Sequence, residues 1–305
     1  MIDPQEIDVV VVGGGPAGLA CALWLGRYRR TVRVYDTGEP RNRPAWAVHG
    51  FPGIADPPPL ELRALIRQQA LDAGADLCVA EVVSINGKKD AWVVCDADGA
   101  VIHARRVVLA YGLRDFVPDV PGIRDYYGHS VYHCPDCDGP GVAGMQIGVL
   151  GNDRHAVALA LFLLTWSPHV TLLTNGETLA ISKQTAAQLA DNGIGVNDGS
   201  IEALRGDGGR LQEIFLGDGI VAMDAIFFHL GSEPRCELAS SIGCGVDDDG
   251  YISVDNGQQT TVPGSYAAGD ISGHPHLAIV AAAEGVRAAL SIHRSLLPDR
   301  FLVNH

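Results

Sequence analysis

Lysine is scarce in this chain of 305 residues, and acidic side chains outnumber basic ones. Lys88, Lys89 and Lys183 are the only lysines, and the formal net charge is −14. Nucleic acids and anionic membrane surfaces bind proteins largely through clusters of positive charge. The charge balance therefore argues against both as partners.

The sequence also lacks a long apolar run and a recognisable signal peptide. The apolar stretch at 9–12 is far too short to cross a bilayer. The residues before it are acidic and contain neither a basic segment nor a small-residue cleavage site. We therefore expect a globular cytoplasmic protein with no membrane partner.

Cysteine is sparse. Seven cysteines spread over the whole chain are too few for a small secreted disulfide scaffold, and an odd number would leave one unpaired. This usage fits a reducing cytoplasm. Cys21, Cys78 and Cys95 lie in apolar runs and are expected to be inert buried thiols.

One sequence pattern is present twice, at 8–36 and at 146–174. Each copy consists of a buried strand, a turn, an apolar helix and a second buried strand. Parallel strands joined by crossover helices form doubly wound sheets. The sequence therefore predicts an α/β protein with two doubly wound, Rossmann-like dinucleotide-binding domains.

The turn of the first copy has the composition of a nucleotide site. Gly13, Gly15 and Gly18 would provide a tight turn, room for a pyrophosphate and close contact between helix and strand. The N–H groups at the start of the helix would bind the phosphates. Asp36 ends the next strand, where a carboxylate accepts hydrogen bonds from ribose hydroxyls.

Two later segments, 106–112 and 264–270, each consist of a strand followed by a turn of small residues. With these segments, the sequence resembles the flavoprotein disulfide reductases that have two dinucleotide-binding domains. The resemblance implies that FAD is the cofactor and that Asp270 binds near its ribityl phosphate.

The heptapeptide HCPDCDG, residues 133–139, has three interpretations. A zinc site would need a second ligand pair, and Cys236 and Cys244 are too far apart in sequence to form the usual one. A purely structural disulfide is disfavoured in a reducing cytoplasm. A redox-active pair, Cys134 and Cys137, is the interpretation that we favour.

The position of this heptapeptide, just before the second copy of the pattern, resembles that of the redox pair in low-molecular-weight thioredoxin reductases. The resemblance covers nearly the whole chain. It implies that Cys137 faces the flavin, that Cys134 meets the substrate and that Asp138 acts as acid and base. His133 is expected to stabilise a thiolate or relay a proton.

The same resemblance implies the architecture. We expect an FAD domain at 1–118 plus 244–305 and an inserted pyridine-nucleotide-type domain at 119–243, which carries the cysteine pair. Rotation between two domains would let the pair meet the flavin and its partner in turn. Homodimers are usual in this family, so we expect one.

The expected cofactor-binding residues come from the first turn and from segments that resemble the flavin site of the family, including the loop 41–53. They are Gly13, Gly15, Pro16, Ala17, Gly18, Asp36, Arg41, Asn42, His49, Ala110, Gly112, Gly269, Asp270, His276 and Leu277.

The second turn, GNDRHA at 151–156, departs from the family pattern. Asp153 would place a carboxylate where a pyrophosphate should approach, unlike the usual glycine-rich turn. Residues 170–204 contain no arginine that could bind the 2′-phosphate of NADPH. The strand at 169–174 also does not end in a carboxylate of the kind that binds NAD, unless Glu177 reaches back to that position. We therefore expect a degenerate site that does not use NADPH, or that holds another nucleotide such as a second flavin.

Several functions stay open. The expected partner is a thioredoxin-like protein or a small disulfide or dithiol, and reduced ferredoxin or another non-pyridine donor is the expected source of electrons. The histidine before the first cysteine resembles the dithiol oxidases, which pass electrons to oxygen, whereas the aspartate after the second resembles the reductases. A flavin-based redox sensor and an inactive nucleotide-binding scaffold are the alternatives from other functional classes.

Overall fold

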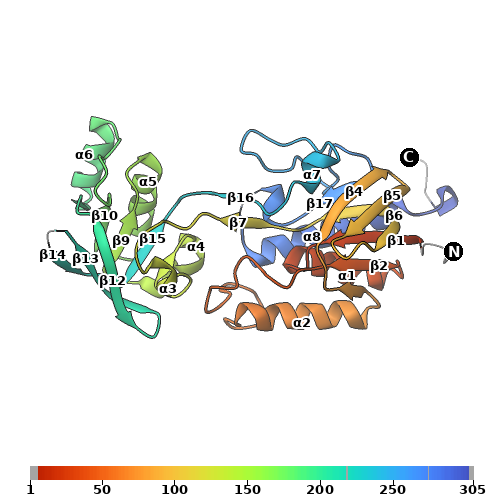
Figure 1. Cartoon of the computed structure of the whole chain (residues 1–305), viewed down its shortest axis with the longest axis horizontal. Coiled ribbons are helices and arrows are strands. Elements are labelled where there is room, and N and C mark those ends of the chain that lie inside the picture. Colours follow the sequence, from red (N-terminus) through yellow and green to blue (C-terminus); the bar gives the residue numbers. More distant parts are fainter. Residues whose placement is uncertain (1–5, 218, 274, 302–305) are drawn as a thin grey trace. The chain divides into compact units, whose positions relative to one another are not determined.

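The computed structural model describes residues 6–217, 219–273 and 275–301. The chain forms two compact units, and it passes from one to the other four times (Figure 1). The first unit contains the residues up to 43, then 51–114 and those from 233 onward, and the second contains 44–50 and 115–232.

The first unit is built on a seven-stranded sheet of order β3-β2-β1-β6-β5-β4, in which β17 also pairs with β6. Strands β1, β2, β3, β6 and β17 pair in parallel, whereas β4, β5 and the start of β6 form an antiparallel meander. Its strands are β1 (Glu6–Val12), β2 (Val32–Tyr35), β3 (Asp76–Cys78), β4 (Val82–Lys88), β5 (Ala91–Asp96), β6 (Val101–Leu109) and β17 (Ser265–Ala267), and its helices are α1 (Pro16–Arg27), α2 (Pro59–Asp72), α7 (Leu238–Ser241) and α8 (Ala278–Ser295).

The second unit contains a five-stranded parallel sheet of order β11-β10-β9-β15-β8 and a separate antiparallel sheet of order β12-β13-β14. Its strands are β8 (Val131–Tyr132), β9 (Ile147–Leu150), β10 (Val170–Leu173), β11 (Gly195–Asn197), β12 (Ile201–Asp207), β13 (Arg210–Leu216), β14 (Gly219–Ala222) and β15 (Ala225–Phe228). Its helices are α3 (Ile123–Tyr126), α4 (Pro135–Asp138), α5 (Arg154–Leu163) and α6 (Lys183–Asp191). The connecting segments pair as β7 (Leu113–Asp115) and β16 (Ser232–Pro234).

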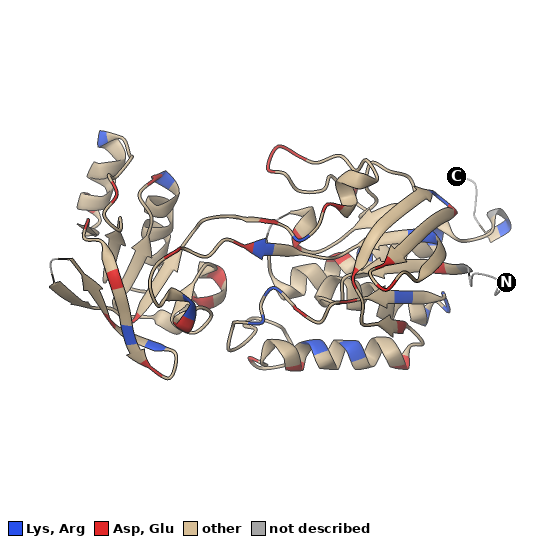
Figure 2. Ribbon diagram, in the orientation of Figure 1, with Lys and Arg blue, Asp and Glu red and all other residues tan. Residues whose placement is uncertain are grey.

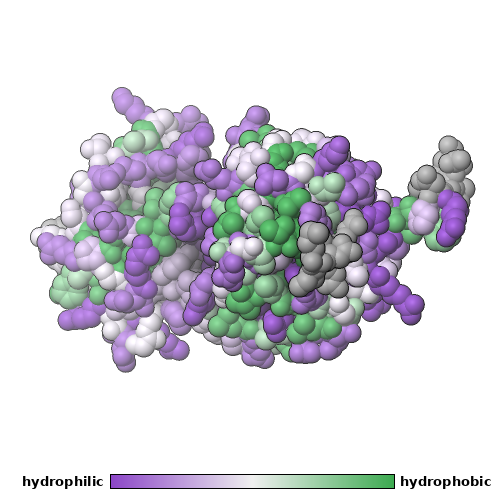
Figure 3. All heavy atoms as spheres, turned by 45° about the vertical axis from the view of Figure 1, so that its right-hand side comes forward, coloured by the Kyte–Doolittle hydropathy of each residue, from purple (hydrophilic) through white to green (hydrophobic). Residues whose placement is uncertain are grey.

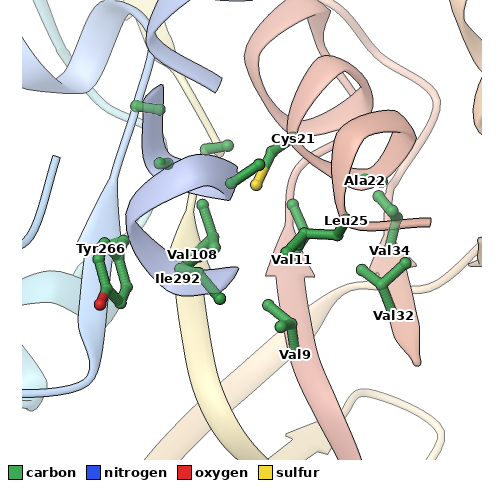
Figure 4. Packing of buried hydrophobic residues seen from close by; sticks show 14 of the residues in the cluster. Val9, Val11, Cys21, Ala22, Leu25, Val32, Val34, Val108, Tyr266 and Ile292 are labelled. Atoms are coloured by element: carbon green, nitrogen blue, oxygen red, sulfur yellow. The ribbon is translucent and has the colours of Figure 1, made fainter. Parts of the chain in front are cut away.

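Both sheets follow from the repeated strand-helix-strand pattern, and the predicted α/β class with two Rossmann-like domains is confirmed. In the first unit, alternate residues of β1 pack on opposite faces of the sheet. Val9 and Val11 join the cluster beneath α1 and α8 (Figure 4). Val10 and Val12 pack on the other face, against the meander and α7. Cys21 is fully buried in the first cluster, and burial raises the pKa of its thiol far above the usual range.

The limits of the two units differ from the expected domain limits at 118/119 and 243/244. Leu238 and Ala239 of α7 lie in the core of the first unit. The chain therefore returns to the first unit at 232/233, before the predicted limit at 243/244. The segment 44–50 belongs with the second unit, where the Trp46 amide donates to the Gly128 carbonyl at 3.3 Å. That the FAD domain and the inserted domain fold separately within the predicted limits stays a prediction.

The surface carries charges of both signs. Helix α2 has acidic residues near both ends and arginines between them (Figure 2). Hydrophobic residues reach the surface at scattered places between hydrophilic ones (Figure 3), and Leu60 and Leu65 of α2 are 47% and 45% exposed. No helix within the described ranges combines the length and apolar character that crossing a bilayer requires.

Candidate functional site

The turn between β1 and α1 depends on glycine. Gly13 has a φ of +111°, and a Cβ there would overlap the carbonyl of Ala110. A Cβ at Gly18 would overlap the carbonyl of Gly13, so helix and turn are in backbone contact. Gly15 caps α1, and a Cβ placed on it meets no atom within 4 Å. This open position at the start of a helix is suited to a phosphate group.

The start of α1 also packs closely against α8. Pro16 occupies the first turn of α1, where a missing N–H removes no helical hydrogen bond. A Cβ at Gly285 would overlap the carbonyl of Ala17, and one at Gly269 would lie 3.0 Å from the Ala17 Cβ. These contacts fix the turn before Asp270 next to the turn after β1.

Asp36 follows β2 and lies directly beside the glycine turn. A Cβ at Gly14 would overlap its carboxylate, which accepts from the Gly38 amide at 3.2 Å and forms an ion pair with Arg63. The Arg63 Nε also donates to the Gly14 carbonyl at 3.1 Å. Arg63 thus binds Asp36 and the turn together.

Asp270 and Arg41 form a half-buried ion pair, with 2.7 Å between Arg41 Nη1 and Asp270 Oδ2. Behind them, Glu284 Oε2 accepts from the Gly269 amide at 2.7 Å and from the Ser272 hydroxyl at 3.1 Å. Burial raises the pKa of Glu284, and these two hydrogen bonds oppose that shift. Glu284 therefore holds the Gly269–Asp270 turn in place.

The other predicted cofactor residues of the first unit lie in nearby turns. Ala110 and Gly112 follow β6, and the Ala110 amide donates to the Val12 carbonyl at 2.8 Å. Asn42 lies in the turn next to Arg41. His276 and Leu277 directly precede α8, and Leu277 is its N-cap.

The residues of the first unit fit FAD. The open turn at Gly15 suits its pyrophosphate, the Asp36 carboxylate its ribose and the Arg41–Asp270 pair its ribityl phosphate region. When bound, FAD supplies a carrier of two electrons.

In the second unit, Cys134 and Cys137 form a disulfide across the short helix α4. Cys134 is the N-cap of α4, and its sulfur accepts a hydrogen bond from the Cys137 amide at 3.2 Å. An amide in this position would stabilise a thiolate on Cys134 once the disulfide is open.

Asp138 lies one residue beyond the disulfide, and burial raises the pKa of its carboxyl to about 6, although the positive charge of His49 opposes the shift. Burial, with a contribution from the Asp138 charge, raises the pKa of the neighbouring Tyr132 to about 12. A carboxyl with a pKa near 6 exchanges its proton readily close to neutrality.

Gly139 is required by the indole that packs behind α4. A Cβ at Gly139 would lie 2.6 Å from the Trp166 ring, and Phe162 packs edge-on against that ring at 5.4 Å between centroids. The aspartate-glycine sequence after Cys137 therefore has a packing reason as well as a chemical one.

His133 lies on the other side of Cys134 and contacts two polar side chains. Its Nδ1 is 3.0 Å from the Tyr127 hydroxyl, and its Nε2 is 3.8 Å from Asp115 Oδ2. The rings of Tyr127 and Phe228 are 5.9 Å apart, so they pack together beside it.

The start of α5, where a second nucleotide would bind, is occupied by the chain's own side chains. Asp153 caps α5 by accepting from the amides of His155 at 2.9 Å and Ala156 at 3.0 Å. These hydrogen bonds, with the backbone amide of Ala156 as the largest cause, lower the pKa of Asp153. Glu177 reaches back to the turn before α5, where its carboxylate accepts a hydrogen bond from the Asn152 side-chain amide at 2.6 Å.

The predicted site residues fall into two groups, one in each unit. His49, predicted as a cofactor residue, belongs to the segment 44–50 and is close enough to Asp138 to affect its pKa. The second unit therefore contains His49, His133, Cys134, Cys137 and Asp138, and the first unit contains all the other predicted residues.

The sequence alone gave no indication of several residues that hold these groups. Arg63 and Glu284 support the nucleotide turns from within α2 and α8, whereas Asp115 and Tyr127 contact His133 and Trp166 packs against Gly139. None of them belongs to a contiguous motif.

Comparisons with known proteins agree with this geometry. The model of the family described as pyridine nucleotide-disulphide oxidoreductase matches residues 7–285. The thioredoxin reductase tcpT of Claviceps purpurea is 32% identical over 288 residues, which are 87% of this chain and 86% of that protein.

Solved structures are similar over nearly the whole chain. The crystal structure of HlmI superposes with a TM-score of 0.90 at 35% identity and covers 95% of this chain and 92% of that one. The putative thioredoxin reductase TrxB of Bacillus anthracis has a TM-score of 0.89 at 28% identity, with 97% and 100% covered. The chain thus belongs to the pyridine nucleotide-disulphide oxidoreductase family, as a flavoprotein disulfide oxidoreductase similar to thioredoxin reductases.

Proposed function

We propose that this protein uses FAD and the Cys134–Cys137 pair to exchange electrons with a thioredoxin-like protein or a small disulfide or dithiol. The observation that carries the proposal is the disulfide at α4 with Asp138 next to it. Relatives with thioredoxin reductase in their names support the choice of partner.

In the reducing direction, the exchange proceeds in two steps. The Cys134 thiolate attacks one sulfur of the partner disulfide, which forms a mixed disulfide and releases the other sulfur as a thiolate. Cys137, once deprotonated, then attacks Cys134, so the internal disulfide forms again and the second partner sulfur leaves. Two electrons thereby pass to the partner. In the oxidising direction the same steps run in reverse.

Asp138 is the group that we assign to proton transfer in this cycle. Its carboxylate removes the proton from the Cys137 thiol before the second attack, and in its protonated form it gives a proton to a departing thiolate. Because its pKa is raised to about 6, both forms are present near neutrality.

We also propose that NADPH is a poor donor of electrons to this protein. A pyrophosphate at the start of α5 would have to displace the Asp153 carboxylate from the amides of His155 and Ala156 and would meet its negative charge. The stretch from 170 to 204 contains no arginine to bind a 2′-phosphate. Together these differences should weaken NADPH binding by roughly a hundredfold or more.

Reduced ferredoxin or another non-pyridine donor is the source of electrons in this proposal. The alternatives are a dithiol oxidase that passes electrons to oxygen, a flavin-based redox sensor, and a second nucleotide held in the α5 region. The similarity to the family also leads us to propose a homodimer, which light scattering tests directly. The sparse cysteines lead us to propose a cytoplasmic location, which fractionation of cells tests.

The test is anaerobic stopped-flow reduction of the bound flavin by NADPH, NADH, reduced ferredoxin and dithiothreitol in parallel. We expect a dithiol or ferredoxin to bleach the flavin and micromolar NADPH to fail. Bleaching by NADPH at the rate of turnover would refute this part of the proposal. Rapid oxygen uptake with a dithiol would identify an oxidase, whereas donor-driven disulfide reduction would identify a reductase.

A further inference from the structure

Three polar side chains from separate parts of the second unit meet beside Cys134. Asp115 ends β7, Tyr127 follows α3, and His133 follows β8. The Tyr127 hydroxyl lies 3.0 Å from His133 Nδ1 and 3.5 Å from Asp115 Oδ2, and the same carboxylate oxygen lies 3.8 Å from His133 Nε2. We call these three residues the Asp115 triad.

The burial of the triad favours a charged histidine. The Asp115 side chain is only 8% exposed, whereas that of His133 is 34% exposed. A carboxylate with so little access to water interacts strongly with a nearby cation. The packing of the Phe228 ring at 5.9 Å from Tyr127 and 6.4 Å from His133 further excludes water from one side.

The hydrogen-bond directions agree with this charge state. A carboxylate can only accept, so the Tyr127 hydroxyl donates when it bonds to Asp115. The tyrosine oxygen is then left to accept from His133 Nδ1, while Nε2 faces Asp115. A proton on Nδ1 satisfies the hydrogen bond to Tyr127, and a second proton on Nε2 makes the ring an imidazolium whose charge lies 3.8 Å from Asp115 Oδ2, within ion-pair distance.

The charge of His133 matters because this residue directly precedes Cys134. We propose that Asp115 and Tyr127 are positioning residues that hold His133 as an imidazolium and thereby favour the thiolate of Cys134 when the disulfide is open. This inference rests on the proposed exchange function and adds to it a set of residues that adjusts the substrate-facing cysteine.

Other titratable groups also lie near the disulfide. Asp136 is an exposed carboxylate between the two cysteines, and Asp138 interacts with both Tyr132 and His49 on the Cys137 side. A negative Asp138 would oppose the thiolate, so it has to be left unchanged in any test of the Asp115 triad.

The test measures how fast iodoacetamide alkylates Cys134 in reduced protein that carries Cys137→Ser. The Cys134 peptide is quantified by mass spectrometry, since other cysteines are present. Asp115→Asn and Tyr127→Phe should each raise the pKa of Cys134. A rise of about one unit lowers the thiolate fraction tenfold at about pH 7, and the thiolate gains roughly threefold in nucleophilicity, so alkylation should slow about threefold.

At about pH 10, where the thiol is ionised in every variant, the same two variants should react at least as fast as the parent. This crossing of the rates separates an electrostatic role from a loss of access, which would slow alkylation at both pH values. Asp119→Asn is the matched control, because Asp119 is an exposed carboxylate of the same segment, and it should change neither rate.

Equal rates at about pH 7, or equal slowing at both pH values, would overturn the inference. Tyr127→Phe removes only one hydroxyl and keeps the test decisive should Asp115→Asn fail to fold. Alkylation needs neither turnover nor flavin, so its outcome is independent of the donor experiments. If the pair proves inactive in exchange while the rates still cross, the proposed function fails and the role of the Asp115 triad stands.

Discussion

Replacement of Asp138 by asparagine should stabilise the protein, and only at a pH where the aspartate is ionised. Burial raises the pKa of this carboxyl from its ordinary value of 3.8 to about 6. The folded protein therefore holds a proton that the unfolded chain has already lost between about pH 4 and pH 6. Across that interval, ionisation of Asp138 lowers the free energy of unfolding as the pH rises.

The gap between 3.8 and about 6 sets the size of the effect. At about 1.4 kcal/mol per pKa unit, the cost reaches about 3 kcal/mol above about pH 7 and is well below 1 kcal/mol at about pH 4. Asparagine has nearly the same shape and no charge. Asp138→Asn should thus exceed the parent in free energy of unfolding by a margin that grows through this interval and then stays constant.

Urea denaturation followed by circular dichroism at several pH values between about 4 and 8 measures this margin. Asp136→Asn is the matched control, because Asp136 is an exposed carboxylate in the same helix, and it should show no such rise. A margin for Asp138→Asn that does not change with pH would refute the claim that an ionised, buried carboxylate is kept here at a cost in stability.

Three further predictions concern the two groups of site residues. Cys134→Ser should leave Cys137 as a thiolate that gives a long-wavelength charge-transfer band with oxidised flavin, whereas Cys137→Ser should not; identical spectra would make the pair structural. Gly13→Ala should destabilise the first unit because its Cβ would overlap the backbone, while Gly15→Ala should fold normally and bind FAD less tightly, as fluorescence titration would measure. Asp270→Ala should increase the fraction of flavin lost on gel filtration, and full retention would contradict its assignment to the cofactor.

The strand-helix-strand units were predictable because all their information is local. The second strand of each predicted pattern, at the end of 8–36 and of 146–174, corresponds to β2 and to β10, and each strand stops one residue before the end of its pattern. The meander of β4 and β5 and the separate sheet of β12, β13 and β14 were not predicted. Hairpin-turn motifs are present, Asp98-Gly99 before β6 and Asp207-Gly208-Gly209 before β13, but the prediction rested on the strand-helix-strand pattern and did not use them.

The site was predictable only where a motif is contiguous. Cys134, Cys137 and Asp138 lie within one heptapeptide, and the glycines of the first turn lie within six residues. Asp115 and Tyr127 reach His133 only because β7, α3 and β8 are brought together by folding. Such contacts depend on the tertiary structure, and a single sequence holds no spacing rule for them.

The short segment 44–50 means that the second unit is not a contiguous cassette of sequence. A protein made of 115–232 alone would lack Trp46, whose backbone amide donates to the Gly128 carbonyl. It would also lack His49, which lowers the pKa of Asp138. Conversely, a chain with 115–232 excised would retain Trp46 without the Gly128 carbonyl to which its amide donates. An exchange of the second unit between relatives must therefore include both segments, 44–50 and 115–232. An exchange of 115–232 alone should change the pKa of Asp138 wherever the relative has a different residue in place of His49.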